Sequence, residues 1–163
     1  MEFLFVQMGG TIDKDYPKTT KGWAFEIGES AIGPMLARLN PTFSYTITSV
    51  CKKDSQEINK ADRNALLSII DNASQEKIII THGTDTMIET AQFLNGKTTK
   101  TVVLTGSMRP EKFKNSDADL NLGVAIGAVS QLDTGVYIAM NGIVSVADQS
   151  ARDLSSGRFI IKH

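Results

Sequence analysis

Short apolar runs alternate along the chain with segments whose apolar residues recur at helical spacing. Apolar runs of about four to eight residues, rich in β-branched residues and bounded by turn-forming residues, are typical of strands. Five such runs predict the main strands, at residues 3–7, 44–50, 77–81, 101–105 and 135–140. Because strands and helical segments alternate, the pattern predicts βαβ units. The expected fold is α/β: an open, mostly parallel sheet with helices on both faces.

Four segments between these strands have apolar residues at helical spacing, which predicts helices with one core face each. The four faces consist of Ile32, Met35, Leu36 and Leu39; of Ala65, Leu66, Ile69, Ile70 and Ala73; of Met87, Ala91 and Leu94; and of Leu122, Ile126 and Val129. Thr84 or Asp85 is a competent N-cap for the third helix, and Ser116-Asp117 is a polar start for the fourth. Asn141-Gly142 predicts a tight hairpin, so the last part of the sheet turns antiparallel.

Length and charge narrow the class of protein. A chain of 163 residues is long enough to bury a core but short for two well-formed domains, so residues 1–163 are expected to form one domain. With 17 basic and 18 acidic residues, the chain has no excess of positive charge to attract nucleic acid or an anionic membrane. No apolar run approaches the roughly 18 residues of a membrane span, and Met1-Glu2-Phe3 lacks the basic start of a signal peptide. We therefore expect a cytoplasmic protein.

The sequence predicts neither a metal nor a cofactor. The single cysteine, Cys51, cannot form an internal disulfide, and the two histidines, His82 and His163, have no metal-ligand spacing. Gly9-Gly10 lacks the third glycine of a dinucleotide fingerprint, and the chain has no Gly-Lys-Ser/Thr phosphate loop.

Polar segments follow four of the predicted strands. These are Gly9-Gly10-Thr11, Asp54-Ser55-Gln56, Gly83-Thr84-Asp85 and Gly106-Ser107-Met108-Arg109-Pro110. In an open parallel sheet, ligands bind outside the carboxyl ends of the strands, so we expect Thr11 and Thr84 to share one pocket there. Turn and capping preferences would explain any one of these loops. Four of them together favour a functional site.

The residue types suit acyl chemistry. A threonine hydroxyl is a weak nucleophile unless a neighbouring network takes its proton, so Thr11 alone would be inert. Backbone N–H groups at turns flanked by Gly10 and Gly83 are suitable donors for an oxyanion. Asp85 suits a substrate ammonium group, but it equally suits helix capping. His82 is more consistent with local hydrogen bonding than with a catalytic base.

The chain resembles the bacterial-type L-asparaginase family. The similarity rests on Gly9-Gly10-Thr11-Ile12 and on the run from Thr81 to Met87, which reads Thr-His-Gly-Thr-Asp-Thr-Met; the other two polar loops follow in the family's order. It covers nearly the whole chain. The resemblance implies an amino-terminal α/β domain that hydrolyses the side-chain amide of asparagine, sometimes glutamine, without metal or cofactor.

The resemblance also implies roles for individual residues. Thr11 is the expected nucleophile, assisted by Tyr16 on a mobile loop, and Thr84 and Asp85 activate and orient it. Ser55, Gln56 and Asp85 are expected to hold the substrate's α-carboxylate and α-ammonium groups, and Ser107 stands where the leaving amide is received. The expected substrate-binding set is Gly10, Asp54, Ser55, Gln56, Gly83 and Ser107.

Two departures from the family pattern affect the expected chemistry. The family's catalytic lysine falls here on Arg152, and arginine stays protonated at any useful pH, so it cannot shuttle a proton. The family continues into a smaller carboxyl-terminal domain that helps to complete a neighbouring subunit's site. We expect that domain to be absent here, which leaves part of the pocket open.

Three functions stay open on this basis. The favoured one is a weakly active amidohydrolase acting on asparagine or a related small amino-acid amide. The second is a non-catalytic binding module for aspartate-like or asparagine-like ligands, in which Arg152 clamps a carboxylate. The third is a subunit of an amidotransferase-like assembly. In each case we expect a homodimer or homotetramer, because exposed sheet edges are commonly covered by symmetric pairing.

Overall fold

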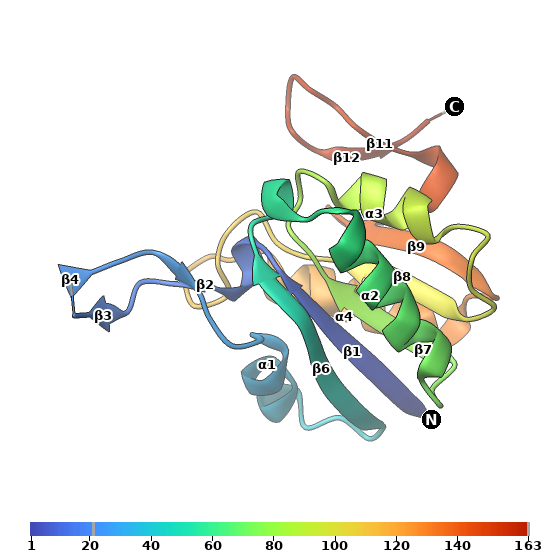
Figure 1. Ribbon diagram of the computed structural model, residues 1–163, viewed down its shortest axis with the longest axis horizontal. Helices are drawn as coiled ribbons and strands as arrows, with labels where there is room; N and C mark the ends of the chain where they lie inside the picture. Colours follow the sequence, from blue (N-terminus) through green and yellow to red (C-terminus); the bar gives the residue numbers. More distant parts are fainter. Residues whose placement is uncertain (21, 163) are drawn as a thin grey trace.

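A computed structural model describes residues 1–20 and 22–162 (Figure 1). Its main sheet has the strand order β10-β9-β8-β7-β1-β6. These strands are β1 (Glu2–Gly9), β6 (Ser44–Lys53), β7 (Lys77–Thr81), β8 (Thr101–Thr105), β9 (Gly135–Met140) and β10 (Ile143–Val146). All neighbouring strands are parallel except β10, which runs antiparallel to β9. The predicted α/β fold and its terminal hairpin are therefore confirmed.

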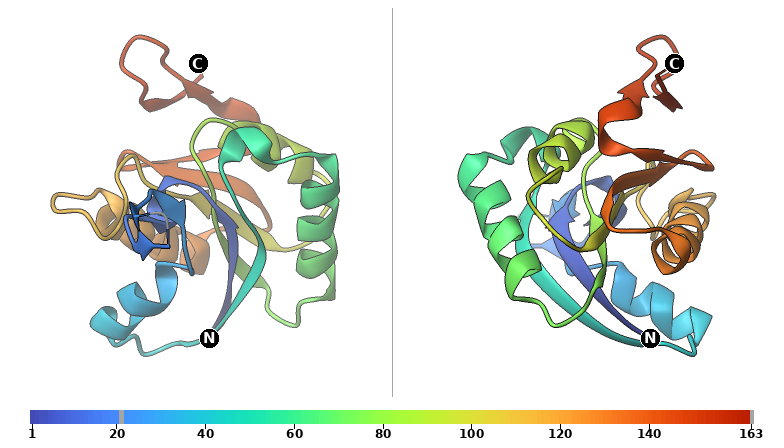
Figure 2. Two further views of the ribbon diagram at one scale, coloured as in Figure 1. Left: turned by 60° about the vertical axis from the view of Figure 1, so that its left-hand side comes forward. Right: turned by 90° about the vertical axis from the view of Figure 1, so that its right-hand side faces the viewer.

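Helices cover both faces of the sheet, as Figure 2 shows. Helices α2 (Lys60–Asn72) and α3 (Met87–Leu94) lie on one face, and α1 (Ile32–Leu39) and α4 (Ala118–Gln131) on the other. Successive strand side chains point to opposite faces, so β7 contributes Ile78 and Ile80 to one core and Ile79 to the other. With both faces covered, the central strands are apolar throughout rather than alternating.

Three details of the predicted helices are wrong. The N-cap of α3 is Thr86, not Thr84 or Asp85, because the preceding turn stays irregular and the Thr86 hydroxyl donates to the Ser55 carbonyl at 2.7 Å. Leu39 is 55% exposed rather than part of the core: it is the last residue of α1, and the chain then turns through the left-handed Asn40. Ala65 is likewise exposed, because α2 turns only a narrow face toward the sheet.

Residues 14–20 and 22–27 form an arm that projects from the sheet (Figure 1). Two short antiparallel pairs build it: β2 (Lys14–Asp15) with β5 (Glu26–Ile27), and β3 (Lys18–Thr19) with β4 (Gly22–Trp23). Its aromatic side chains are exposed and pack on one another. The ring of Tyr16 stacks on Trp23 with centroids 6.2 Å apart and lies 6.0 Å from that of Phe25.

A buried carboxyl group fixes the root of this arm. Asp13 accepts hydrogen bonds from the Ala31 N–H at 2.8 Å and from Gln7 Nε2 at 3.0 Å. Gln7 also donates to the Gly28 carbonyl at 3.0 Å, and the Gly28 N–H donates to the Asp13 carbonyl at 2.9 Å. Both ends of the arm are therefore attached to β1. Burial raises the pKa of Asp13 to about 6, although its hydrogen bonds and the charge of Lys52 act in the opposite direction.

A second hairpin, β11 (Ser150–Arg152) and β12 (Phe159–Ile161), lies near the amino-terminal end of α3. The Phe159 N–H donates to the Asn141 side chain at 2.9 Å, and the buried Phe159 ring belongs to the same core cluster as Met87 and Ala91 of α3. Among the described residues, none of the helices has the length and apolarity needed to cross a membrane.

Asp13 should make stability fall as the pH rises. In the unfolded chain its carboxyl ionises near pH 3.8, whereas in the fold it keeps its proton up to about pH 6. Between these values the folded state binds more protons, so Asp13 should lower the unfolding free energy by roughly 3 kcal/mol across this window. In urea unfolding from pH 4 to 7, this loss should appear as a difference between the wild type and Asp13→Asn, because the buried His82, whose pKa is lowered to about 4, changes stability in the opposite direction over the same window. The exposed Asp71→Asn serves as the control, and parallel curves for wild type and Asp13→Asn would contradict the assignment.

Candidate active site

Glycines allow the four polar loops to meet at one edge of the sheet. A side-chain carbon on Gly10 would lie 2.3 Å from the Gly83 nitrogen and 2.4 Å from its Cα. One on Gly83 would lie 2.6 Å from the Cβ of Ser55, and one on Gly106 would lie 2.3 Å from the His82 carbonyl oxygen. No real Cβ fits at such distances. The loops after β1, β6, β7 and β8 therefore touch backbone to backbone, as the sequence predicts.

Thr11 and Thr84 each follow one of the contacting glycines. Thr11 is the first residue of the short helix η1 (Thr11–Asp13), entered from Gly10 with φ of 91°, and Thr84 lies in the turn before α3. Both threonines are partly exposed to solvent. They lie on adjacent turns although more than seventy residues separate them in the sequence. Their chemical roles remain predictions.

Asp85 is bound on both carboxylate oxygens. Gln56 Nε2 donates to Oδ2 at 2.9 Å, and Arg152 Nη1 donates to Oδ1 at 2.9 Å. Arg152 is itself oriented by its own hairpin, since its Nε donates to the Gly157 carbonyl at 3.0 Å and its guanidinium lies 5.8 Å from the centre of the Phe159 ring. Three residues predicted for the site, from three separate elements, are thus in direct contact.

Asp54 is paired with a residue that the sequence analysis did not single out. Lys14 Nζ, from the arm, lies 2.9 Å from Asp54 Oδ2, and this hydrogen bond lowers the pKa of Asp54. Asp54 also forms a capping box with Glu57 around the short helix η2 (Ser55–Glu57). Ser55 is buried beneath Gly83, with its carbonyl bound to Thr86. A lysine just after the Gly-Gly-Thr run carries no pattern of its own, so only the fold reveals this pair.

The loop after β8 is held by the start of α4. Ser107 is buried, and its hydroxyl donates to the Arg109 carbonyl rather than pointing away from the loop. Asp117 accepts from the N–H groups of Met108 at 3.0 Å and of Arg109 at 3.1 Å. Asn121 donates to the Gly106 carbonyl at 3.0 Å. The polar start of this helix was visible in the sequence, but its binding to the loop was not.

His82 is completely buried behind the loop that carries Thr84. Its Nδ1 lies 2.7 Å from the Gly83 carbonyl and its Nε2 lies 2.8 Å from the Thr90 hydroxyl. Burial lowers the pKa of His82 to about 4, and the nearby charge of Arg63 acts in the same direction. A neutral imidazole with both nitrogens bonded locally is suited to holding the loop rather than to acting as a base.

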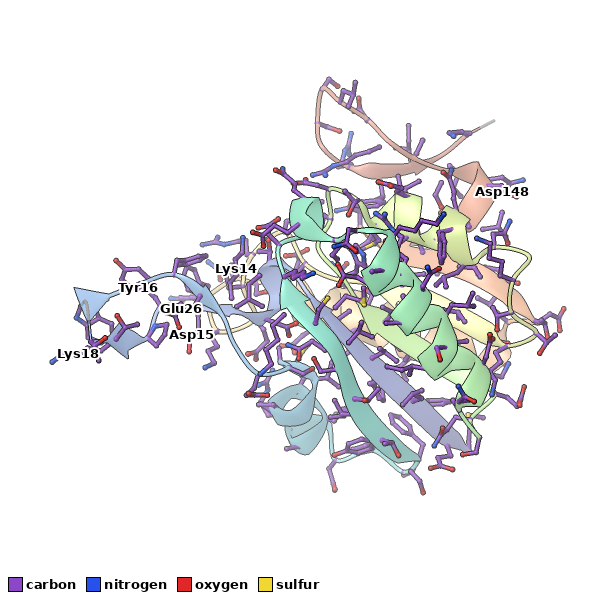
Figure 3. All side chains as sticks on the ribbon, viewed as in Figure 1. Lys14, Asp15, Tyr16, Lys18, Glu26 and Asp148 are labelled. Atoms are coloured by element: carbon purple, nitrogen blue, oxygen red, sulfur yellow. The ribbon has the colours of Figure 1, made fainter. Side chains whose placement is uncertain are left out.

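Tyr16 is the one predicted catalytic residue that lies apart from the cluster. It is on the projecting arm, as Figure 3 shows, with half of its surface exposed. A cleft of about 370 Å³ lies at the root of the arm, lined in part by Ile12, Asp13, Glu26 and Lys112. Its lining includes Ile12, the residue after Thr11, but neither Thr11 nor Thr84. It is therefore not the shared pocket expected from the sequence.

Comparisons with known proteins agree with this arrangement. The family model described as "Asparaginase, N-terminal" matches residues 2–159. A glutaminase-asparaginase from Acinetobacter glutaminasificans is 30% identical over 98% of this chain and 51% of its own length. The structure of the thermostable L-asparaginase from Thermococcus kodakarensis superposes with a TM-score of 0.82 and 26% identity, covering 99% of this chain and 51% of that one.

A shorter match links the chain to a different kind of enzyme. One of the subunits of a glutamyl-tRNA(Gln) amidotransferase from Methanococcus maripaludis is 39% identical over 51% of this chain and 20% of its own length. In each of these comparisons the chain spans about half of the similar protein or less.

Replacing Gly10 should separate the first and third loops. In Gly10→Ala, the alanine is strained at the positive φ of this position. Its Cβ also overlaps the Gly83 backbone, which cannot move aside as a flexible side chain could. Gly22→Ala is the matched control, because Gly22 has φ of +102° but nothing within 4 Å of the added carbon. We expect Gly10→Ala to lower the unfolding free energy by about 2–4 kcal/mol in urea titrations, and Gly22→Ala by about 1 kcal/mol. Equal losses would mean that backbone strain alone, not the contact between loops, makes Gly10 necessary.

Proposed function

The chain belongs to the asparaginase family, and on that premise we propose that it is an amidohydrolase of the asparaginase type. The main support is the backbone contact between Gly10 and Gly83, because Thr11 and Thr84 directly follow these glycines and the bound carboxylate of Asp85 comes next in the chain. The proposed substrate is asparagine or a related small amino-acid amide. The description of the Acinetobacter relative as a glutaminase-asparaginase supports that substrate class.

The proposed reaction begins with attack of the Thr11 hydroxyl on the carbon of the side-chain amide. Its proton passes toward Thr84 and Asp85, while backbone N–H groups near Gly10 and Gly83 stabilise the developing oxyanion. The C–N bond then breaks, ammonia leaves with a proton, and the acyl group remains as an ester on Thr11. Water hydrolyses this ester and restores the threonine. No metal or redox step is needed to balance the reaction.

Arg152 makes the proposed enzyme a weak one. Its contact with Asp85 places a permanent cation beside the proton-accepting network, and a guanidinium cannot take the proton from Thr84 or Asp85. The same ion pair favours a second candidate, a binding module whose guanidinium holds a ligand carboxylate. The match to an amidotransferase subunit keeps a larger assembly as a third candidate. A homodimer or homotetramer, and a cytoplasmic location, remain predictions.

Thr11→Ala should abolish ammonia release without abolishing binding. The substitution removes the nucleophile but leaves Ser55, Gln56 and Asp85, so aspartate should still raise the melting temperature in proportion to ligand excess. Thr11→Ser, which keeps a hydroxyl, is the matched control and should retain part of the activity. Ammonia release from asparagine, glutamine and acetamide identifies the class of amide that the protein hydrolyses. Binding of aspartate without ammonia release from any amide would replace the enzyme by the binding module.

Arg152→Lys should raise the rate of amide hydrolysis. Lysine keeps the positive charge beside Asp85 but restores a group that can exchange a proton with Thr84. A gain of about tenfold in kcat would correspond to roughly 1.4 kcal/mol of barrier. Arg158→Lys, an exposed position on the same hairpin, controls for general effects of the substitution. Strong wild-type activity that Arg152→Lys leaves unchanged would mean that the proton acceptor lies elsewhere, with Tyr16 and Lys162 the first alternatives.

A further inference from the structure

A buried chain of hydrogen bonds runs from α2 to the carbonyl group that precedes Thr84. Arg63 Nε, on α2, donates to the hydroxyl of Thr90, on α3, at 3.0 Å. That hydroxyl lies 2.8 Å from His82 Nε2, and His82 Nδ1 lies 2.7 Å from the Gly83 carbonyl oxygen. His82 and Thr90 are fully buried, and Arg63 is 7% exposed.

Two groups fix the hydrogen-bond directions in this chain. The Gly83 carbonyl only accepts, so His82 Nδ1 carries the ring proton and donates it, and Nε2 of the neutral ring accepts from the Thr90 hydroxyl. The guanidinium only donates, and a hydroxyl oxygen that accepts from a cation becomes a stronger donor and a poorer second acceptor. Arg63 therefore favours this histidine tautomer without a hydrogen bond of its own to the ring.

The carbonyl that His82 holds determines where the next N–H points. In a trans peptide the C=O and N–H bonds are antiparallel, so holding the Gly83 oxygen inward directs the Thr84 N–H outward, away from the core. Glycine has no side chain to restrict this peptide, and it turns readily unless something holds it. Within residues 1–20 and 22–162, no protein oxygen accepts from the Thr84 N–H. It is a free donor at the edge where an amide oxygen would become an oxyanion.

Burial of Arg63 has no evident benefit for stability. Its Nη2 is buried without a hydrogen-bond partner among the described residues, and its ion pair, at 3.1 Å, is with a Glu89 side chain that is 64% exposed. An unpaired buried polar group costs free energy that an apolar side chain of similar size would avoid. A buried arginine whose Nη2 makes no hydrogen bond, and whose Nε is directed at the residue that binds His82, is better explained by a functional role.

We propose that Arg63 is a positioning residue for amide hydrolysis: acting through Thr90 and His82, it fixes the orientation of the Gly83–Thr84 peptide. This rests on the proposed function. Without the guanidinium, the Thr90 oxygen becomes a better acceptor, and its hydroxyl can accept a hydrogen bond from an Nε2–H of His82 while donating to a carbonyl of its own helix. The lone pair of Nδ1 would then face the Gly83 oxygen, and the peptide would turn to avoid it.

Steady-state kinetics on the full chain tests the catalytic consequence. Arg63→Met and Thr90→Val should lower kcat by roughly tenfold to hundredfold and change KM by less than about twofold, because a donor to the transition state is misdirected. Thr90→Ser keeps the hydroxyl and should stay near wild type, as should the exposed control Arg158→Met. Thermal unfolding should show no loss of stability in Arg63→Met. Unchanged kcat, or a loss that follows the unfolded fraction, would overturn the proposal.

Histidine ring ¹⁵N NMR tests this relay, the chain of hydrogen bonds from Arg63 through Thr90 to His82, without an activity assay. The chain has two histidines, so His163→Gln leaves the signals of His82 alone. We expect the neutral Nδ1–H form at pH 7 and also at pH 5, and a shift toward the Nε2–H form in Arg63→Met. An unchanged tautomer in Arg63→Met would overturn the proposal whatever the kinetics show. If the relay responds as expected but the wild type releases no ammonia from any amide, the proposed function fails, and with it the catalytic purpose of the relay.

Discussion

The candidate site depends on the contact between the backbones of Gly10 and Gly83. Strands β1 and β7 are neighbours in the sheet, and neighbouring strands lie about 4.8 Å apart, so the loops that leave them stay together only if no side chain intervenes. A side chain on Gly83 would likewise collide with Ser55, and one on Gly106 would collide with the His82 carbonyl. The four loops therefore form one surface because these glycines have no side chains to separate them. Thr11 and Thr84 directly follow Gly10 and Gly83, so this contact holds their two turns together.

Two outer elements are joined to this glycine-lined surface by ion pairs. Lys14 connects the arm to Asp54, and Arg152 connects the carboxyl-terminal hairpin to Asp85. All four side chains are partly exposed, and such pairs contribute only about 0–1 kcal/mol each. The root of the arm is different, because Asp13 and Gln7 are buried and hydrogen-bonded. The arm therefore has a firm base and a weakly held outer part, which suits a segment that moves over a site.

Polar groups inside the molecule lie where they control these loops. His82, Thr90 and Arg63 lie behind the turn of Thr84, and Asn121 and Asp117 hold the loop after β8. Buried hydrogen bonds restrict the groups that they join. Here they act on backbone carbonyl and N–H groups rather than on side chains at the surface. The orientation of the loop peptides is therefore determined partly from the interior.

The sequence alone was sufficient for the order of the main strands and helices, the parallel sheet, the Asn141-Gly142 hairpin and the four loops that meet at the sheet edge, but not for the strands of the arm or for β11 and β12. Periodicity reports which residues share a face of one element, and parallel topology brings the ends of strands together, so these features follow from local patterns. The family's pattern assigned Asp85, Gln56 and Arg152 to one site, but it did not predict that Asp85 contacts the other two. Spacing could not show that Leu39 ends its helix exposed, or that α3 begins after Thr86.

Only the tertiary structure decided which polar groups pair across elements. Asp13 with Gln7, Lys14 with Asp54, and Arg63 with Thr90 and His82 join segments whose separation carries no periodic signal. It also placed Tyr16 on an exposed arm that projects from the sheet. The physical reason is that a hydrogen bond or ion pair requires a particular distance and direction, and these are set by how elements pack. Local sequence specifies each element, whereas packing specifies what each side chain meets.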